Sequence, residues 1–413
     1  MECLKTLDSE DLHTMSTFDS DSNGQGLQTR LIHTPPADAS GFNALPAPIM
    51  RGSTTFFENT AAQRKPVDQL GLDYSYGLHG NPTQYTLAGK LAQIEQAKHC
   101  LLVPSGLAAI TLVGSALLKT GDHWCLPANA YGPAHSLARL WQSQYGISFD
   151  VYDPMDAADL ERRLRPETRL VWTETPGSLT FEVPDMKALT AVARARNIPV
   201  CVDNTWSSGL HFKPFDHGVD ISIQALTKYQ GGHADVIMGS VCSNNTALFA
   251  KVENINRLWG LGVSPDDCAL VLRSLITLPL RHREQAAVAM RIAQWVSSQP
   301  EVDRLLHPAF ASCPGHNNWK RDFTGSASLF AFTLKAPLAD ADAVRFVDTL
   351  KVFHIGYSWG GPESLALAFD MPANRRQHIG GSTLIRLAIG LEDEADLMAD
   401  LQRAFAAIRV GAA

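Results

Sequence analysis

The stretch CLLVPSGLAAITLVGSALL, residues 100–118, is the most informative part of this 413-residue chain for its fold. It carries no charged residue and approaches the length of a membrane-spanning helix. The turn residues Pro104, Ser105 and Gly106, however, divide it into a short apolar run and a longer one. We therefore interpret it as a buried strand, a tight turn and a core helix, and not as a membrane span.

Short apolar runs and helical patterns continue to alternate along the sequence that follows. The expected strands are residues 101–103, 123–126, 147–152, 170–173, 199–202, 221–225 and 236–240. The expected helices are residues 108–118, 131–140, 156–164 and 186–196. This alternation predicts an α/β domain in which helices cover both faces of a parallel sheet. Ligands of such sheets bind beyond the carboxyl ends of the strands.

The pattern changes after about residue 269, where a smaller α+β domain is expected. Its predicted elements are helices at 270–280 and 284–297, a strand at 328–334, a helix at 340–350, a strand at 384–389 and a helix at 393–408. The first 25 residues are polar and acidic and lack the apolar segment of a signal peptide. We therefore divide the chain into a disordered tail (1–25), an extended arm (26–85), a large domain (86–270) and a small domain (271–413).

The composition narrows the classes of partner. With 42 acidic and 35 basic residues the formal net charge is −7, which argues against nucleic acid and anionic membranes because both need a clustered positive face. Seven scattered cysteines without a C-x-x-C pair argue against a disulfide framework or a zinc ribbon and favour the reducing cytoplasm. No two histidines have the spacing of metal ligands near a carboxylate, so we expect no metal site.

Two charged residues follow apolar strands of the predicted sheet. Lys228, in GVDISIQALTKY (218–229), comes just after the strand at 221–225. Desolvation there would lower its pKa and make it an amine nucleophile toward an aldehyde, although a lysine at a strand end can also point into solvent. Asp203 follows the strand at 199–202. Its carboxylate could keep a pyridine nitrogen protonated, as pyridoxal phosphate requires, or could form an Asx turn or a helix cap.

Three further features are ambiguous when each is taken alone. The turn Ser105-Gly106-Leu107 opens an apolar helix, so its N–H groups could bind a phosphate, or it could be a plain turn. Tyr131 could stack on a flat ring and exchange protons, or could belong to the core. Arg386 lies within the apolar run 384–389, where a buried guanidinium needs a carboxylate. That carboxylate could belong to an amino-acid substrate or to a structural ion pair.

The order of these features, together with several longer motifs, resembles a known family. The motifs are RGST (51–54), ETPGS (174–178), DNTW (203–206), TKY (227–229), WKRDFTG (319–325), YSWGG (357–361) and LIRL (384–387). They resemble the pyridoxal-phosphate enzymes of cysteine and methionine metabolism, the trans-sulfuration group, from about residue 29 to residue 408. Within this group the chain is most similar to the bacterial cystathionine β-lyases.

The resemblance implies a fold and a chemistry. The fold would be type I of the pyridoxal-phosphate enzymes, the aspartate-aminotransferase type, with a mixed, mostly parallel seven-stranded sheet and a smaller C-terminal domain. The activity would be that of a carbon–sulfur lyase of methionine biosynthesis, which performs α,β-elimination on cystathionine-like amino acids and gives homocysteine, pyruvate and ammonia. A γ-lyase acting on cystathionine, methionine, a homoserine-type substrate or canavanine stays open, because both eliminations use the same machinery. A non-catalytic protein that kept the fold is the remaining alternative.

The resemblance also assigns roles to residues around the cofactor. Lys228 would bind the cofactor aldehyde and act as the base, Asp203 would pair with the pyridine nitrogen, and Tyr131 would stack on the ring and share the catalytic proton transfers. The phosphate would be held by Gly106, Leu107 and Thr227.

Substrate and subunit contacts follow from the same resemblance. The substrate carboxylate would bind Arg386 and Ser358, while Trp359 and Ser178 favour β- over γ-elimination. Tyr76 matches the family tyrosine that reaches into the neighbouring subunit's site, which implies a homodimer unit, usually paired into a tetramer. One departure stands out: two residues after that tyrosine the family carries a phosphate-binding arginine, and this chain has Leu78.

Overall fold

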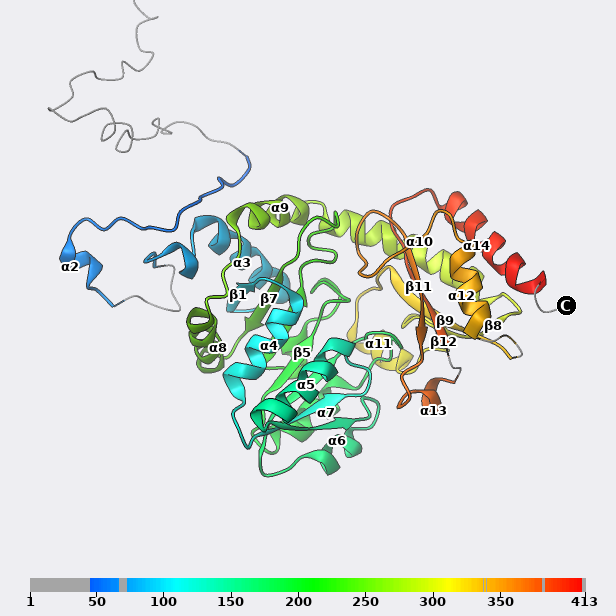
Figure 1. Ribbon diagram of the computed structural model, residues 1–413, viewed down its shortest axis with the longest axis horizontal. Coiled ribbons are helices and arrows are strands. Elements are labelled where there is room, and N and C mark those ends of the chain that lie inside the picture. The colour runs from blue at the N-terminus through cyan, green and yellow to red at the C-terminus, as the bar shows by residue number, and fades with distance from the viewer. Residues whose placement is uncertain (1–44, 67–72, 337, 339, 381–382, 411–413) are drawn as a thin grey trace, which may run out of the picture. The chain divides into compact units, whose positions relative to one another are not determined.

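Seven strands between residues 99 and 243 form the larger sheet of the computed structural model, which describes residues 45–66, 73–336, 338, 340–380 and 383–410. The strands are β1 (His99–Val103), β2 (His123–Pro127), β3 (Ser148–Tyr152), β4 (Thr168–Glu174), β5 (Val200–Asp203), β6 (Ile221–Ala225) and β7 (Gly239–Ser243). Their order is β1-β7-β6-β5-β4-β2-β3 (Figure 1). Only β7 runs antiparallel to its neighbours, so the expected mixed, mostly parallel seven-stranded sheet is confirmed.

The last expected strand of this sheet, 236–240, was wrong in its position, and the alternation of strands and helices did not show which strand is antiparallel. The strand is β7, which begins at Gly239. The backbone of Met238 is bonded instead to Thr227, in the turn that follows β6. The connection from β6 to β7 contains no helix, and adjacent parallel strands need a long crossover. The chain therefore returns antiparallel, which an apolar run alone does not reveal.

Helices cover both faces of this sheet, as the sequence predicts. One face carries α4 (Gly106–Leu117), α5 (Gly132–Tyr145) and α8 (Thr246–Trp259), and the other carries α6 (Ala157–Arg163) and α7 (Met186–Arg194). Alternate residues of β4 serve the two faces: Leu170 and Trp172 pack with α4 and α5, whereas Val171 packs with α7. Because central strands such as β2 and β5 are buried on both faces, their sequences lack a regular alternation of apolar and polar residues.

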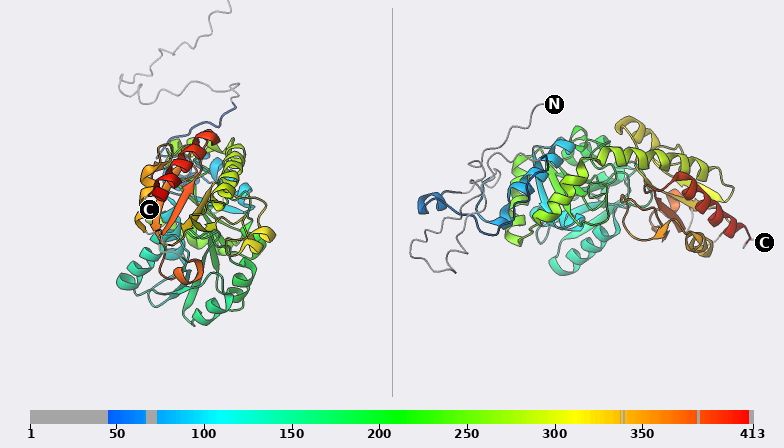
Figure 2. Two further views of the ribbon diagram at one scale, coloured as in Figure 1. Left: turned by 90° about the vertical axis from the view of Figure 1, so that its right-hand side faces the viewer. Right: turned by 90° about the horizontal axis from the view of Figure 1, so that it is seen from above.

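A second sheet of five strands follows in the C-terminal part, in the order β10-β11-β12-β9-β8. The strands are β8 (Val302–Leu306), β9 (Leu329–Leu334), β10 (His354–Ile355), β11 (Leu365–Asp370) and β12 (Thr383–Ala388). The helices that pack on it are α10 (Leu278–Ser297), α12 (Asp340–Thr349) and α14 (Glu394–Val410). Both views in Figure 2 show α14 on the outer side of this sheet. The sequence did not predict β8, β10 or β11, which are short or only partly buried.

The remaining elements connect or flank the two sheets. They are α2 (Thr60–Gln63), η1 (Gly77–His79), α3 (Pro82–Glu95), η2 (Pro214–His217), α9 (Pro265–Leu275), α11 (His316–Asp322) and α13 (Arg376–Ile379). Residues 47–413 form one compact unit. The expected tail, residues 1–25, lies outside the described residues, as does the first part of the arm. Among the described helices, none combines the length and the apolar character that crossing a bilayer requires.

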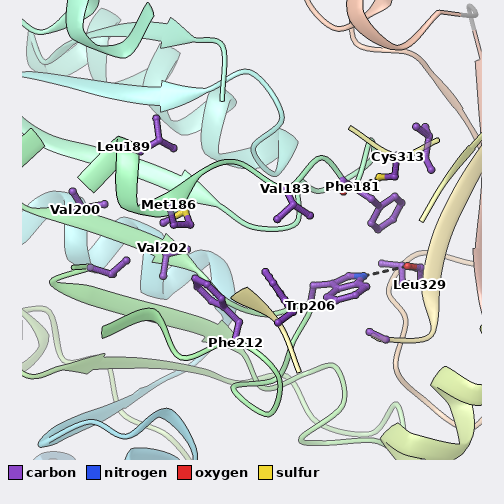
Figure 3. Packing of buried hydrophobic residues seen from close by; sticks show 14 of the residues in the cluster. Phe181, Val183, Met186, Leu189, Val200, Val202, Trp206, Phe212, Cys313 and Leu329 are labelled. Carbon is purple, nitrogen blue, oxygen red and sulfur yellow. Dashed lines mark hydrogen bonds between the residues drawn. The ribbon is translucent and has the colours of Figure 1, made fainter. Parts of the chain in front are cut away.

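One hydrophobic cluster joins the two sheets beside the end of β5. Figure 3 shows Phe181, Val202 and Phe212 from the larger sheet and its loops packed in the same cluster as Cys313 and Leu329. The indole Nε1 of Trp206 donates a hydrogen bond of 3.1 Å to the carbonyl oxygen of Leu329 in β9. The segment that follows Asp203 is therefore fixed to the smaller sheet as well as to the larger one.

Candidate active site

The carboxyl ends of β4, β5 and β6 lie side by side and carry three charged side chains. Glu174 at the end of β4 is the direct neighbour of Asp203 at the end of β5 in the strand register. Lys228 lies in the turn that follows β6, which ends at Ala225. The sheet topology thus brings together the two residues that strand-end reasoning selected, at the edge where ligands of such sheets bind.

Lys228 points toward the smaller sheet and not into solvent. The turn that carries it is closed by hydrogen bonds from Lys228 N to the Ala225 carbonyl (3.2 Å) and from Gly232 N to the Lys228 carbonyl (2.7 Å). Its ammonium donates to Ser358 Oγ over 2.7 Å and lies 5.4 Å from the ring centroid of Trp359. Burial, helped by the charge of Arg386 and opposed by Asp203, lowers the pKa of Lys228 to about 8.

Asp203 is partly buried and is held at one of its two carboxylate oxygens. Its Oδ1 accepts hydrogen bonds from the backbone N–H of Thr205 (3.0 Å) and from the Thr205 hydroxyl (2.5 Å), so the Asx turn considered above is present. Both bonds given by the described residues end on Oδ1, which leaves Oδ2 available for a ring nitrogen. Burial raises the pKa of Asp203, whereas the bonds from Thr205 and the charge of Lys228 lower it.

Arg386 in β12 is a buried guanidinium that no carboxylate of the described residues neutralises. Arg386 is 8% exposed. Its guanidinium carbon lies 4.8 Å from the ring centroid of Phe369, and its Nη2 donates a hydrogen bond of 3.3 Å to the Ser358 carbonyl. Burial lowers the pKa of Arg386 to about 10, against the opposing influence of Tyr131 and Tyr357. The described structure therefore gives no support to the structural ion pair that the sequence left open.

Tyr131 and Ser178 are both tied to Glu174. The backbone N–H of Tyr131 donates to Glu174 Oε2 over 2.7 Å, and the Ser178 side chain is close enough to lower the pKa of this carboxyl group. Burial and the negative charge of Asp203 hold the pKa of Glu174 well above its usual value, and burial raises that of the Tyr131 hydroxyl. The sequence gave Glu174 no role, although it ends an apolar strand as Asp203 does, and the same criterion would have selected it.

The beginning of α4 offers hydrogen-bond donors to an anion. Ser105 caps the helix: its Oγ accepts from Ala108 N (3.0 Å) and its carbonyl from Ala109 N (3.1 Å). Among the described residues this leaves the N–H groups of Gly106 and Leu107 without an acceptor. A side chain at position 106 would bring its Cβ within 2.7 Å of the Cβ of Ala225, so only glycine allows this close approach to β6.

Thr227, the third expected phosphate ligand, has another partner in this structure. Its hydroxyl donates to the carbonyl oxygen of Met238 (3.3 Å) and accepts from the Met238 N–H (3.2 Å). Taken together, the donor set fits pyridoxal phosphate: an amine of lowered pKa suits the aldehyde, a partly buried carboxylate suits the ring nitrogen, and helix N–H groups suit the phosphate.

Tyr76 and Leu78 belong to the arm. Tyr76 is 49% exposed, forms a β-bridge with Thr54 and packs edge-on against His79. None of its hydrogen bonds or ring contacts within the described chain reaches the residues around Lys228. Leu78 lines a small cavity with Leu101 of the same chain and offers no charge to a phosphate.

Comparisons with known proteins agree with this geometry. The family model of the Cys/Met metabolism PLP-dependent enzymes matches residues 28–406. The chain belongs to this family. Its cofactor is therefore pyridoxal 5'-phosphate, and its fold is type I of the enzymes that use it.

Individual relatives in the family are similar over nearly their whole length. Identity is 38% to the cystathionine β-lyase of Bordetella avium (93% of this chain, 98% of the relative) and 35% to that of Escherichia coli K12 (92% and 98%). Among solved structures, the cystathionine γ-synthase of Xanthomonas oryzae pv. oryzae is similar with a TM-score of 0.82 and 29% identity, over 90% of this chain and 95% of that one.

Proposed function

We propose that this enzyme cleaves a carbon–sulfur bond of cystathionine-like amino acids by α,β-elimination and releases homocysteine, pyruvate and ammonia. The observation that carries the proposal is the buried Arg386 without a carboxylate partner among the described residues, joined through Ser358 to Lys228. A buried guanidinium is costly unless it is paired, and an α-carboxylate pairs with both arms of its fork. The names of the β-lyase relatives support the same substrate class.

The roles of the residues follow from their positions. Arg386 binds the substrate carboxylate and turns the Cα–H bond toward the amine of Lys228. Bound pyridoxal phosphate supplies the electron sink that makes this bond acidic. Asp203 would pair with the ring nitrogen through Oδ2, and its negative charge would keep that nitrogen protonated. With the pKa of Lys228 at about 8, roughly a tenth of the amine is neutral at pH 7, and the neutral form is the one that acts as a general base.

The departing sulfur must receive a proton when the Cβ–S bond breaks and its electron pair moves to sulfur. Lys228 Nζ, which carries the proton from Cα, is the first donor in our proposal, and the Tyr131 hydroxyl is the second. Ser178, near Glu174, and Trp359, beside Lys228, would form the walls against which the Cβ substituent lies. In our proposal, these two residues make the enzyme favour β-elimination over γ-elimination.

Product analysis tests the type of elimination. The holoenzyme is incubated with L-cystathionine, and the keto acid is identified by mass spectrometry after derivatisation. Pyruvate with homocysteine is the expected result. If 2-oxobutyrate with cysteine forms instead, the enzyme is a γ-lyase, a chemistry that the structural similarity to the γ-synthase also accommodates.

The anchor of the cofactor is tested separately. Borohydride reduction of the holoenzyme should leave the label on the tryptic peptide that contains Lys228, and Lys228→Ala should neither retain the label nor turn over substrate. Lys251, an exposed lysine of α8, serves as the control as Lys251→Ala. A label on any other lysine would overturn the assignment of Lys228.

We further propose a homodimer unit paired into a tetramer, with Tyr76 completing the site of the neighbouring subunit. Apolar side chains of the arm support this oligomer: Phe56 is 94% exposed and Tyr76 is 49% exposed.

A cytoplasmic location is supported by Cys125 and Cys201, which are buried free thiols. The two separate sheets support the division into a large domain (86–270) and a small one (271–413). Light scattering on the purified protein tests the oligomer.

A further inference from the structure

A buried carboxylate outside the substrate site joins the segments that carry Asp203 and Lys228. Glu95 is the last residue of α3 and is 1% exposed. Its side chain accepts hydrogen bonds from Asn204 Nδ2 (2.9 Å), from Ser222 Oγ (2.5 Å) and from Gln224 Nε2. Three donors, one just after β5 and two within β6, therefore converge on one carboxylate.

Each donor belongs to a segment that also carries a residue of the proposed chemistry. Asn204 directly follows Asp203, and Ser222 and Gln224 lie in β6, which leads into the Lys228 turn. Gln230 Nε2 in turn donates to Gln224 Oε1. The hydrogen bonds of Glu95 thus reach Gln224 before Lys228 and, through Gln224, Gln230 after it. On the other side, Glu95 holds Asn204, the residue next to Asp203.

The surroundings of Glu95 are built for a carboxylate. Asn204 is fully engaged, because its Oδ1 also accepts from Ser207 Oγ over 2.7 Å. Gly209 has φ +67°, and any Cβ there would collide with Glu95 Oε1, so the chain leaves this space to the carboxylate. The ammonium of Lys213, bonded to the Ile94 and Gly209 carbonyls, adds a favourable charge to Glu95.

We propose that Glu95 is a positioning residue that fixes Lys228 relative to Asp203. The strands themselves are aligned by backbone hydrogen bonds, but the side chains that do the chemistry lie beyond the strand ends, where this alignment stops. Above its pKa the carboxylate of Glu95 accepts from all three donors at once, whereas an amide in its place would turn an N–H₂ group toward at least one of them and would reverse or break that hydrogen bond. The inference rests on the proposed roles of Lys228 and Asp203.

The test measures the Lys228 amine in the protein without cofactor. The variant is Glu95→Gln, and the matched control is Glu161→Gln on the exposed side of α6. Competitive acetylation at a series of pH values, followed by mass spectrometry of the Lys228 peptide, gives the pH at which the amine is half reactive. Thermal unfolding and circular dichroism establish that each variant is folded.

In the unchanged chain the midpoint should lie near pH 8. In Glu95→Gln it should rise by at least about half a pH unit, because a displaced Lys228 is less desolvated. The holoenzyme should lose about 10- to 100-fold in kcat, as expected for a misplaced catalytic group, with KM changed by less than about twofold. Glu161→Gln should match the unchanged chain in both readings.

An unchanged Lys228 midpoint and an unchanged kcat in folded Glu95→Gln would overturn the proposal. If Glu95→Gln does not fold, the same two measurements on Gln224→Met test the proposal. This variant keeps the volume of the side chain and removes the hydrogen bond between Glu95 and Gln224 that leads to the Lys228 turn. The midpoint is read without cofactor. A failure here is therefore distinct from a failure of the proposed function, which would appear as a borohydride label away from Lys228.

Discussion

Lys228 Nζ donates a hydrogen bond of 2.7 Å to Ser358 Oγ, although the two residues are 130 positions apart in the sequence. Ser358 has φ +80°, in the left-handed region that residues other than glycine rarely adopt. The backbone carbonyl of the same residue accepts from Arg386. One strained residue thus contacts both the proposed base and the proposed carboxylate-binding group, as is typical of strain kept at a functional site.

Replacing Ser358 separates its backbone strain from its hydroxyl. Both Ser358→Ala and Ser358→Gly lose the bond to Lys228, so we expect a similar fall in kcat from both. Glycine adopts φ +80° without strain, so Ser358→Gly should be more stable than Ser358→Ala by about 1 kcal/mol. Urea unfolding and steady-state kinetics measure the two effects. Equal stabilities of the variants would mean that the backbone is relaxed there, and an undiminished kcat would mean that the hydroxyl is not used.

Replacing Arg386 should affect binding far more than folding. Arg386→Leu removes a buried charge and, among the described residues, leaves no carboxylate unpaired, so the free energy of unfolding should change by less than about 1–2 kcal/mol. The loss of two charge-assisted hydrogen bonds to the substrate should lower kcat/KM by roughly 10²- to 10³-fold. Arg386→Lys keeps the charge without the fork and should recover only part of this loss. A large loss of stability in Arg386→Leu would instead indicate a structural role.

The Arg386→Leu variant also bears on the amine of Lys228. The charge of Arg386 is the second cause, after burial, of the lowered pKa of Lys228. Without it, the acetylation midpoint of Lys228 in the protein without cofactor should rise above about 8, since one source of repulsion for the ammonium is gone. A midpoint that falls or stays constant would contradict the proximity of the two cations in solution.

Asp203→Asn tests the charge beside the ring nitrogen. The amide oxygen can still accept from Thr205, so the turn should persist and the variant should fold. The negative charge is lost, and kcat should fall by at least about 10³-fold, because a neutral partner does not keep the ring nitrogen protonated. Stopped-flow absorbance of the holoenzyme with substrate locates the affected step. A kcat within about tenfold of the unchanged enzyme would exclude the proposed role of Asp203.

Several of these residues were accessible from the sequence because strand ends are a local signal. Lys228 and Asp203 directly follow apolar runs, and a parallel sheet necessarily brings such ends to one edge. The pairing of Arg386 was not accessible, because the presence or absence of a carboxylate near it depends on contacts far apart in the chain. Glu95 gave no local signal at all: it ends a helix whose first residues are polar, and its burial comes from β6.

The elements of the fold that depend on local sequence were predicted, and those that depend on distant contacts were not. Helices α4 to α7 and strands β1 to β6 were predicted near their observed positions from periodicity. The direction of β7 was not, because it depends on the form of the connection after Lys228. Strand β11 was missed because only Ala366 within it is fully buried, so that its sequence carries little apolar contrast.

The pH dependence of stability offers a test of the buried state of Glu95 that needs neither substrate nor cofactor. Burial raises the pKa of Glu95 from the ordinary 4.5 to about 7, despite the bonds from Ser222 and Asn204. Between these values the folded state keeps a proton that the unfolded state has released. The stability contributed at this position must therefore fall as pH rises from about 4.5 to about 7, and stay constant above that range.

Glu95→Gln has no proton to lose, so its stability lacks this slope. The free energy of unfolding of the unchanged chain, minus that of Glu95→Gln, should decrease by roughly 3 kcal/mol between pH 4.5 and pH 7.5. Urea unfolding of both proteins without cofactor at half-unit steps of pH measures this difference, and other titrating groups cancel in it. Glu161→Gln, measured in parallel, should show no such slope. If the difference between the chain and Glu95→Gln is also flat, Glu95 is ionised throughout this range, and its burial is offset by the three donors and Lys213 more completely than the fold suggests.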